Sequence, residues 1–494
     1  DNLMSSMTLD QRIAQLFMVA AYSNKDISHQ NEIENLITNY QIGGLMFMQG
    51  GPVRQLKLTN KYQSLSKVPL MIAQDAEWGL SMRIDSTIIY PWQMTLGALS
   101  CDSLIYNMGF DIAQQCKRLG VNINFAPVVD VNSNPINPII NNRSFGENPF
   151  RVAQKSLAYM QGLQDGGVMA CAKHFPGHGD TDSDSHKTLP TINHTYERLD
   201  TVDLIPFKNL IKKGLGSVMV AHLHIPSIDD TDSLASTLSA NIVRDLLKDS
   251  LDFKGLVITD ALNMKGVSQF YEPGLVDLKA LLAGNDILLF AEDVPKAIKK
   301  VKEAIVNKAI SEEEINSRCR KILMAKKWFG LDERLLLNSS DLIQDLNIKR
   351  YETLNRNLVE KSMTVLQNTN DLLPLKRLDT LNIALVSIGE KSNQFQQTLS
   401  NYAPIKTFYL NEQHSDKERK KMLDSLAQYN LVIASVHKSN KNAWKSYRIH
   451  QNTDLFLQTL ALQSNVVLSV FANPYSISDF LMTYSFDGLI MAYQ

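Results

Sequence analysis

Short apolar runs rich in β-branched residues alternate with amphipathic segments along the first part of the chain. Eight runs occur: Leu16–Ala21, Gly43–Met48, Leu70–Gln74, Val121–Val129, Val168–Ala172, Ser217–Ala221, Gly255–Thr259 and Asp286–Phe290. The segments between them, such as Leu104–Leu119 and Pro149–Asp165, carry apolar residues at helical spacing. Strands that alternate with helices in this way predict an α/β fold, a (β/α)8 TIM-type barrel. An open doubly wound sheet is the alternative, and eight repeats in one block favour the barrel.

The second part of the chain predicts a smaller α/β domain. Five further runs indicate a parallel sheet with helices on both faces: Asn382–Ser387, Lys406–Leu410, Leu431–Ser435, Val466–Phe471 and Leu489–Tyr493. We expect the barrel over residues 1–330, a polar linker over 331–352 and an αβα sandwich over 353–494. Because the chain stops directly after the last strand, with no covering helix, the sandwich is expected to be C-terminally incomplete.

Composition and charge exclude several classes of protein. The hydrophobic fraction of 44% and charged fraction of 20% are ordinary for a soluble globular protein. The net charge is −1 with no long run of like charge, so neither a nucleic-acid partner nor a polybasic membrane patch is indicated. No apolar stretch reaches the roughly 18 residues of a membrane span.

Neither the cysteines nor the first residue of the chain identifies the cellular compartment. The four cysteines lack CxxC spacing and are expected to be buried thiols: Cys101, Cys116, Cys171 and Cys319. The chain begins with Asp1 rather than Met, which fits a removed leader. An exported or periplasmic location and a cytoplasmic one both stay open, as does the oligomeric state.

Polar and charged side chains follow the predicted strands where each one ends. The densest group is Lys173–His186, which holds three histidines and three aspartates and is broken from its strand at Pro176-Gly177. The other strand ends carry Asp75, Glu77 and Arg83; Asp130 and Arg143; His222 and His224; Asp260; and Glu292-Asp293. Since the carboxyl ends of parallel barrel strands meet at one rim, these groups predict an active site there.

Carboxylates and hydrogen-bonding cations around one pocket suit sugar chemistry. A retaining glycosidase needs a carboxylate nucleophile and a proton donor about 5 Å apart. Asp260 follows a buried run and is the nucleophile candidate, although an aspartate that caps the next helix is an equally good interpretation of its position. Asp184 can hold the imidazole of His186, two residues away in an extended loop, and make it an acid/base. The alternative is that this pair only orders a glycine-containing loop.

Taken together, these residues resemble glycoside hydrolase family 3, in its bacterial β-N-acetylglucosaminidase branch. The likeness is carried by Lys173–Gly179 (KHFPGHG) and Asp184-Ser185-His186, and it extends to Ser362–Asn368 at the opening of the second domain. The resemblance implies a retaining exo-glycosidase that releases terminal, non-reducing β-linked N-acetylglucosamine without metal or cofactor. It implies N-acetylglucosaminides as substrates, with peptidoglycan-derived muropeptide fragments as the natural ones.

The resemblance also implies individual roles. Asp260, in Ile258-Thr259-Asp260-Ala261, matches the family nucleophile, and His186 with Asp184 matches the acid/base pair of the branch. The positions that match sugar-binding residues are Asp75, Arg83, Arg143, Lys173 and His174. His178 is expected only to order the loop.

One segment departs from the family pattern. Where the family commonly has Glu-Gly-Gly-Arg after the binding aspartate, this chain has Glu77-Trp78-Gly79-Leu80. The arginine of that run is missing and a tryptophan replaces a glycine, whereas Arg83 is kept. Catalysis is expected to be intact, and the substrate preference is left open, because Trp78 can stack on a sugar face or narrow the site.

Alternative functions remain open from sequence. Within the family, a β-glucosidase or a phosphorylase that uses phosphate in place of water fits the same motifs, and Glu292-Asp293 offers a reversed acidic pair for a substrate-assisted route. A metal-dependent barrel hydrolase would use His222 and His224 with His174 and Asp260. A non-catalytic sugar-binding protein is disfavoured, because both Asp260 and the Asp184/His186 pair are present.

Overall fold

Eight parallel strands form the barrel in the first part of the chain. The structure is a computed structural model that describes residues 2–182, 188–333, 336–439 and 447–493. The strands are β1 (Phe17–Ala21), β2 (Gly44–Phe47), β3 (Met71–Gln74), β4 (Ile123–Asn124), β5 (Met169–Phe175), β6 (Ser217–Val220), β7 (Leu256–Thr259) and β8 (Leu288–Leu289). They pair in the order β7-β6-β5-β4-β3-β2-β1-β8, and a parallel bridge between Ile258 and Ile287 joins the two ends. Each strand lies within one of the eight predicted runs, except that β5 continues past Ala172 to Phe175, and this agreement confirms the barrel.

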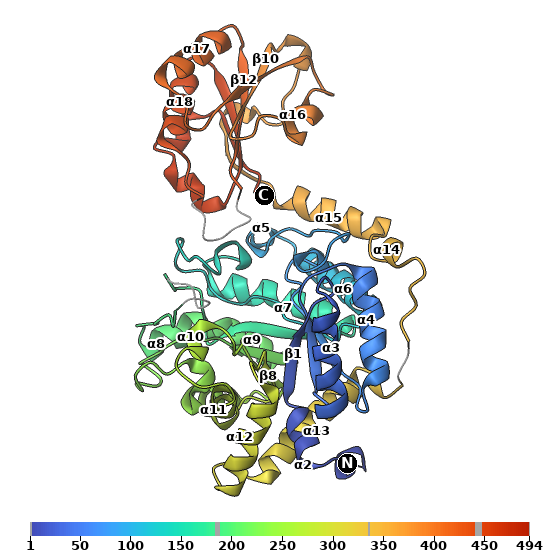
Figure 1. Cartoon of the computed structure of the whole chain (residues 1–494). Helices are drawn as coiled ribbons and strands as arrows, with labels where there is room; N and C mark the ends of the chain where they lie inside the picture. The colour runs from blue at the N-terminus through green and yellow to red at the C-terminus, as the bar shows by residue number, and fades with distance from the viewer. Residues whose placement is uncertain (1, 183–187, 334–335, 440–446, 494) are drawn as a thin grey trace. The chain divides into compact units, whose positions relative to one another are not determined.

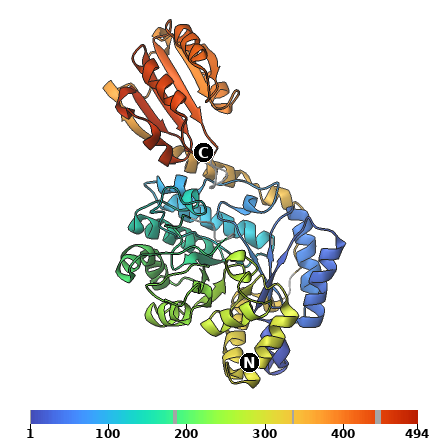
Figure 2. The ribbon, with the colours of Figure 1, turned by 60° about the vertical axis from the view of Figure 1, so that its left-hand side comes forward.

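Helices surround this sheet (Figures 1 and 2). The α-helices are α1 (Asn2–Ser5), α2 (Leu9–Ala14), α3 (Ile27–Asn35), α4 (Pro52–Leu65), α5 (Gln93–Gly97), α6 (Ser103–Arg118), α7 (Pro149–Asp165), α8 (Tyr196–Arg198), α9 (Leu204–Lys212), α10 (Lys265–Ser268), α11 (Leu275–Ala283), α12 (Val294–Val306), α13 (Glu312–Trp328), α14 (Leu342–Asp345) and α15 (Lys349–Ser362). Tighter or wider helical turns are η1 (Leu36–Tyr40), η2 (Leu80–Met82), η3 (Asn141–Arg143), η4 (Leu199–Asp203), η5 (Ser236–Leu238), η6 (Asn241–Ser250) and η7 (Leu331–Glu333).

Local sequence explains where the main helices begin. Helix α7 starts at Pro149 because the Asn148 side chain accepts hydrogen bonds from the backbone N–H of Phe150 and Arg151. Helix α13 starts with a capping box, in which Ser311 and Glu314 satisfy each other's backbone N–H groups. These caps fix the points at which the chain turns from a loop into a helix that packs on the barrel.

The second unit contains one mixed sheet. Its strands are β9 (Thr364–Asn368), β10 (Ile383–Ile388), β11 (Ile405–Leu410), β12 (Leu431–His437), β13 (Asn465–Phe471) and β14 (Gly488–Met491), in the order β11-β10-β12-β13-β14-β9. The short 3-10 turns are η8 (Thr369–Asp371), η9 (Leu378–Thr380), η10 (Pro474–Asp479) and η11 (Thr483–Ser485). Figure 1 shows α16 (Gln394–Leu399) on one face of the sheet and α17 (Asp416–Leu426) and α18 (Gln451–Ala461) on the other.

The expectation of a purely parallel, five-stranded sheet was wrong in one respect. The five predicted strands are present and parallel, but β9 adds a sixth strand that runs antiparallel to β14. Its residues are mostly exposed, so they lack the continuous apolar pattern that marked the other strands. An antiparallel edge strand on a parallel sheet is a common arrangement.

Contacts within the chain divide it into two units, Asp1–Leu358 and Val359–Gln494. The segment 331–352, expected as a linker, contains η7, α14 and the start of α15. Three of the cysteines are buried as expected, but Cys101 is exposed, because it lies in the polar turn before α6. Within the described part of the chain, no helix combines the length and apolarity that crossing a bilayer requires.

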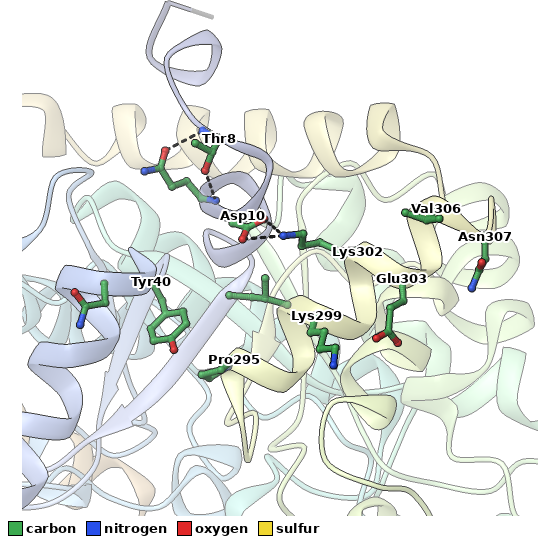
Figure 3. A pocket seen from close by; sticks show the side chains of 12 residues that line it. Thr8, Asp10, Tyr40, Pro295, Lys299, Lys302, Glu303, Val306 and Asn307 are labelled. Atoms are coloured by element: carbon green, nitrogen blue, oxygen red, sulfur yellow. Dashed lines mark hydrogen bonds and ion pairs between the residues drawn. The ribbon is translucent and has the colours of Figure 1, made fainter.

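The N-terminal end of the barrel carries a pocket of about 600 Å³ between α2, η1 and α12 (Figure 3). Asp10 and Lys302 form an ion pair across it, with 2.8 Å between Oδ1 and Nζ. Barrel helices run opposite to the strands, so the end of α12 at Val306 lies at the rim away from the carboxyl ends of the strands. Active sites of such barrels lie at the opposite rim, where the strands end.

Candidate active site

A network of buried charges lies where β3 and β5 end. Lys173 Nζ is 2.8 Å from Asp75 Oδ1 and 2.7 Å from Glu77 Oε1. Arg83 pairs with the second oxygen of Asp75. Arg143, from η3, donates to both oxygens of Glu77, at 2.9 Å from Nε and 2.7 Å from the terminal nitrogen. Two carboxylates thus share three cations, and the bidentate pair fixes the plane of the arginine.

The network keeps both carboxylates ionised. Burial alone would raise the pKa of each, but Lys173 and Arg83 outweigh it at Asp75 and hold its pKa well below the ordinary value. At Glu77, Arg143 and Lys173 outweigh burial and lower the pKa to about 2. Burial lowers the pKa of Lys173, but the charges of Asp75 and Glu77 outweigh it and raise this pKa above its ordinary value. At neutral pH the charges of this cluster are therefore fixed.

Asp130, at the end of the fourth predicted strand, orients His174. Its Oδ2 is 2.7 Å from Nδ1 of His174, and its carboxylate accepts the backbone N–H of His174 at 3.2 Å and of His178 at 2.7 Å. Burial would raise the pKa of Asp130, but the two histidines and these hydrogen bonds lower it. The opposite nitrogen of His174, Nε2, lies 3.4 Å from the Arg143 guanidinium, so His174 joins the charge network.

The loop after β5 is tied to its surroundings on both sides. His178 Nδ1 is 2.8 Å from the hydroxyl of Thr181, and Asn137 donates to the His178 carbonyl at 2.9 Å. Burial lowers the pKa of His178 to about 4, so its ring is neutral at neutral pH. Further along, Asp180 pairs with His194. Residues 183–187, with the predicted acid/base pair Asp184 and His186, lie outside the described residues.

Asp260 lies at the same rim, directly after β7. Its backbone N–H donates to the Val220 carbonyl at 2.9 Å, and its Oδ1 accepts from the Ala261 N–H at 2.8 Å. Burial raises the pKa of Cys171, beneath Lys173, to about 12, and the Asp260 charge adds to this effect. That charge also acts on His178. Asp260 is partly exposed, and its charge acts on one residue of β5 and one residue of the loop that follows it.

His222 is held by protein groups at both ring nitrogens. Nδ1 is 2.7 Å from the Thr237 hydroxyl, and Nε2 is 3.0 Å from the Ala261 carbonyl. These contacts tie the end of β6 to η5 and to the residue after Asp260. Among the described residues no group of three or more His, Cys, Asp or Glu side chains is arranged to hold a metal ion. The geometry therefore gives no support to a metal-dependent hydrolase built on His222 and His224.

The structure brings all five predicted sugar-binding residues into one network: Asp75, Arg83, Arg143, Lys173 and His174. Sequence reasoning assigned no role to Glu77, which joins Arg143 to Lys173, or to Asp130, which holds His174. Both had been noted as carboxylates that follow a predicted strand. Buried cations need carboxylate partners. The position of Glu77 and Asp130 at strand ends, where several cations were expected, could therefore have indicated their pairing role.

A parallel barrel with buried, fixed charges at the carboxyl ends of its strands has the architecture of the α/β-barrel enzymes. Residues 8–325 match the model of the glycosyl hydrolase family 3 N-terminal domain. The chain belongs to glycoside hydrolase family 3, as the Lys173–His186 loop predicted, and it is an enzyme of that family.

Named relatives agree with this assignment. The chain is similar to a β-hexosaminidase A from Pseudoalteromonas piscicida, with 31% identity over 408 residues, which covers 75% of this chain and 67% of the relative. It is also similar to a β-N-acetylglucosaminidase/β-glucosidase from Cellulomonas fimi, with 26% identity covering 76% and 67% of the two chains. A solved family 3 β-N-acetylglucosaminidase from Paenibacillus sp. str. FPU-7 superposes with a TM-score of 0.79 at 28% identity, covering 99% of this chain and 94% of that one.

Proposed function

We propose that this family 3 enzyme is a retaining β-hexosaminidase that releases terminal, non-reducing β-linked N-acetylglucosamine. The observation that carries the proposal is the network around Asp75, Glu77 and Lys173, which holds fixed donors and acceptors at the barrel rim where Asp260 also lies. Sugar hydroxyls need such paired donors and acceptors. The names of the relatives, several of them β-hexosaminidases, support N-acetylglucosamine as the released sugar.

The proposed reaction has two covalent steps. In the first, a carboxylate oxygen of Asp260 bonds to the anomeric carbon while His186, oriented by Asp184, gives its proton to the leaving glycosidic oxygen. In the second, His186 takes a proton from water, the water oxygen attacks the anomeric carbon, and the bond to Asp260 breaks. Two inversions restore the β configuration, and Asp260 returns as a carboxylate.

Specific residues hold the sugar during both steps. Asp75 is an acceptor fixed by Arg83 and Lys173, and it suits hydroxyls at the far side of the ring. Lys173, Arg143 and His174 supply donors at the inner side. Because these side chains are already held by one another, little ordering is needed when the sugar binds. We propose muropeptide fragments of peptidoglycan as the natural substrates.

Covalent trapping tests the mechanism. Incubation with a 2-deoxy-2-fluoro glycoside that carries an activated leaving group, followed by peptide mass spectrometry, should place the adduct on Asp260. The Asp260→Ala variant should give no adduct and should lose turnover by several orders of magnitude. An active enzyme whose adduct maps to another residue refutes the assignment of Asp260.

The dependence of the rate on the leaving group tests whether His186 is the proton donor. The His186→Ala variant should lose about 10²–10⁴-fold in kcat on a disaccharide and far less on a 4-nitrophenyl glycoside, which needs little protonation. Equal losses on both substrates would remove His186 from this role. A parallel panel of β-glucosides and β-N-acetylglucosaminides, with and without phosphate, separates the hexosaminidase from a β-glucosidase and from a phosphorylase.

A further inference from the structure

Two tryptophans lie against each other, and one of them directly follows a residue of the charge network. The rings of Trp78 and Trp92 have centroids 3.9 Å apart at an angle of 48°. Both side chains are partly exposed. Trp78 directly follows Glu77, whose carboxylate is paired with Arg143 and Lys173. A partly exposed aromatic pair is thus attached to the segment that carries Asp75 and Glu77.

The position of Trp92 is fixed by its neighbours on the same rim. Gln93, the first residue of α5, donates to the Val128 carbonyl at 2.7 Å and accepts the Val128 N–H at 3.2 Å. At its other end α5 approaches the segment after η3 so closely that a methyl group on Gly97 would lie 2.1 Å from the Phe145 carbonyl oxygen. Trp92 is therefore held between the segments that deliver Asp130 and Arg143.

The loop that joins the two tryptophans is held in place as well. The Tyr90 N–H donates to the Trp78 carbonyl at 3.1 Å, and the Tyr90 ring packs on Gly79, which has a φ of +89°. From the region of α14 and α15, Asn347 donates to the Ser86 carbonyl and Asn355 to the Ile89 carbonyl, each at 2.9 Å. The aromatic surface is thus ordered before any ligand arrives, which lowers the cost of binding.

We propose that Trp78 and Trp92 form the binding surface for the first sugar of the leaving group, so that the preferred substrates are oligosaccharide glycosides. This inference rests on the proposed hexosaminidase function. A pyranose ring has a polar edge and an apolar C–H face, and an indole surface covers such a face while the hydroxyls stay in water. The charge network binds the released sugar through its hydroxyls, and the adjoining aromatic surface is the part of the rim suited to the next ring.

Kinetics with two substrates of similar reactivity test the proposal. N,N′-diacetylchitobiose carries a sugar leaving group, whereas methyl β-N-acetylglucosaminide has a methyl group that cannot reach the tryptophans. For Trp78→Ala and Trp92→Ala we expect kcat/KM on the disaccharide to fall about tenfold or more, mainly through KM. On the methyl glycoside kcat/KM should stay within about twofold of the wild type.

Two further variants distinguish binding from structure. Trp78→Phe keeps an aromatic face and should recover most of the disaccharide activity. Trp328→Ala is the matched control, because Trp328 is 55% exposed on α13, outside the site, and this change should affect neither substrate. Thermal unfolding followed by circular dichroism shows whether the alanine variants are folded.

Each outcome is decisive. Equal losses on both substrates, or no loss on either in folded variants, overturn the aromatic surface while the hexosaminidase proposal stands. A wild-type enzyme that cleaves neither substrate overturns the proposed function. In that case quenching of tryptophan fluorescence by the disaccharide but not by N-acetylglucosamine, lost in Trp78→Ala, still supports the surface, and equal quenching by both sugars rejects it.

Discussion

Replacing Glu77 with glutamine removes the central charge of the network while keeping its shape. The pKa of Glu77 is about 2 against an ordinary 4.5. That difference of about 2.5 pH units, at about 1.36 kcal/mol each, amounts to about 3 kcal/mol in favour of the ionised side chain. Because Glu77 is 1% exposed, solvent does not reduce this value. Since glutamine resembles the protonated acid, Glu77→Gln should cost about 3 kcal/mol of unfolding free energy at pH 7.

The pH dependence gives the sharper test. A carboxyl group whose pKa is lowered by folding stabilises the folded state above its unfolded pKa, and this stabilisation is lost as the pH falls from about 4.5 towards 2. The difference between Glu77→Gln and the wild type should therefore shrink to about 2 kcal/mol at pH 3.5. Urea unfolding of the full chain, followed by tryptophan fluorescence, measures both values.

A matched substitution on the surface provides the control. Glu312 is half exposed and pairs with Arg12 at 2.8 Å, so Glu312→Gln should cost less than about 1 kcal/mol at either pH. If Glu77→Gln is no more destabilising than Glu312→Gln at pH 7, the network does not hold the charge of Glu77 as described. A loss that stays the same down to pH 3.5 would also refute the electrostatic explanation.

Two other changes give distinct readouts. Asp130→Asn should lower kcat/KM about 10–100-fold, because His174 loses the charged acceptor at its Nδ1; an unchanged kcat/KM would contradict this. Lys326 is buried with one hydrogen bond, to Gln15 at 2.6 Å, and burial lowers its pKa to about 7. Because the unfolded chain binds this proton more tightly, stability is reduced below pH 7 and recovers as the pH rises towards 10.5. Lys326→Met should therefore raise the unfolding free energy by about 2–4 kcal/mol at pH 6 and by little near pH 10. Chemical unfolding at the two pH values measures this gain. An equal gain at both would show that protonation of Lys326 is not its cause.

The barrel could be predicted from sequence because each of its strands is buried on both faces. Such strands appear as continuous apolar runs, as Leu256–Thr259 does. Strand β9 could not be found in this way, since an edge strand with exposed side chains has no such pattern. Its partner β14 was predicted, because it lies inside the sheet.

Candidate site residues could be predicted where the local sequence is unusual. They were harder to predict where their role depends on an ion pair with a residue distant in sequence. Lys173 and His174 were marked by a dense polar loop directly after an apolar strand. Glu77 and Asp130 act by pairing with residues distant in sequence, and the number and identity of those partners depend on the folded barrel. Carboxylates at strand ends are common enough that position alone does not distinguish a pairing role from a helix cap.

The loop after β5 is anchored on both sides of residues 183–187. On one side of residues 183–187, Asp180 pairs with His194, and beyond them a bridge joins Thr191 to His224. The contacts described for Lys173 and His174 are made with residues that follow other strands, namely Asp75, Glu77 and Asp130. Under the proposed assignment, the proton donor and the sugar-binding residues are therefore anchored by different contacts, so a redesign of residues 183–187 keeps the contacts described for Lys173 and His174.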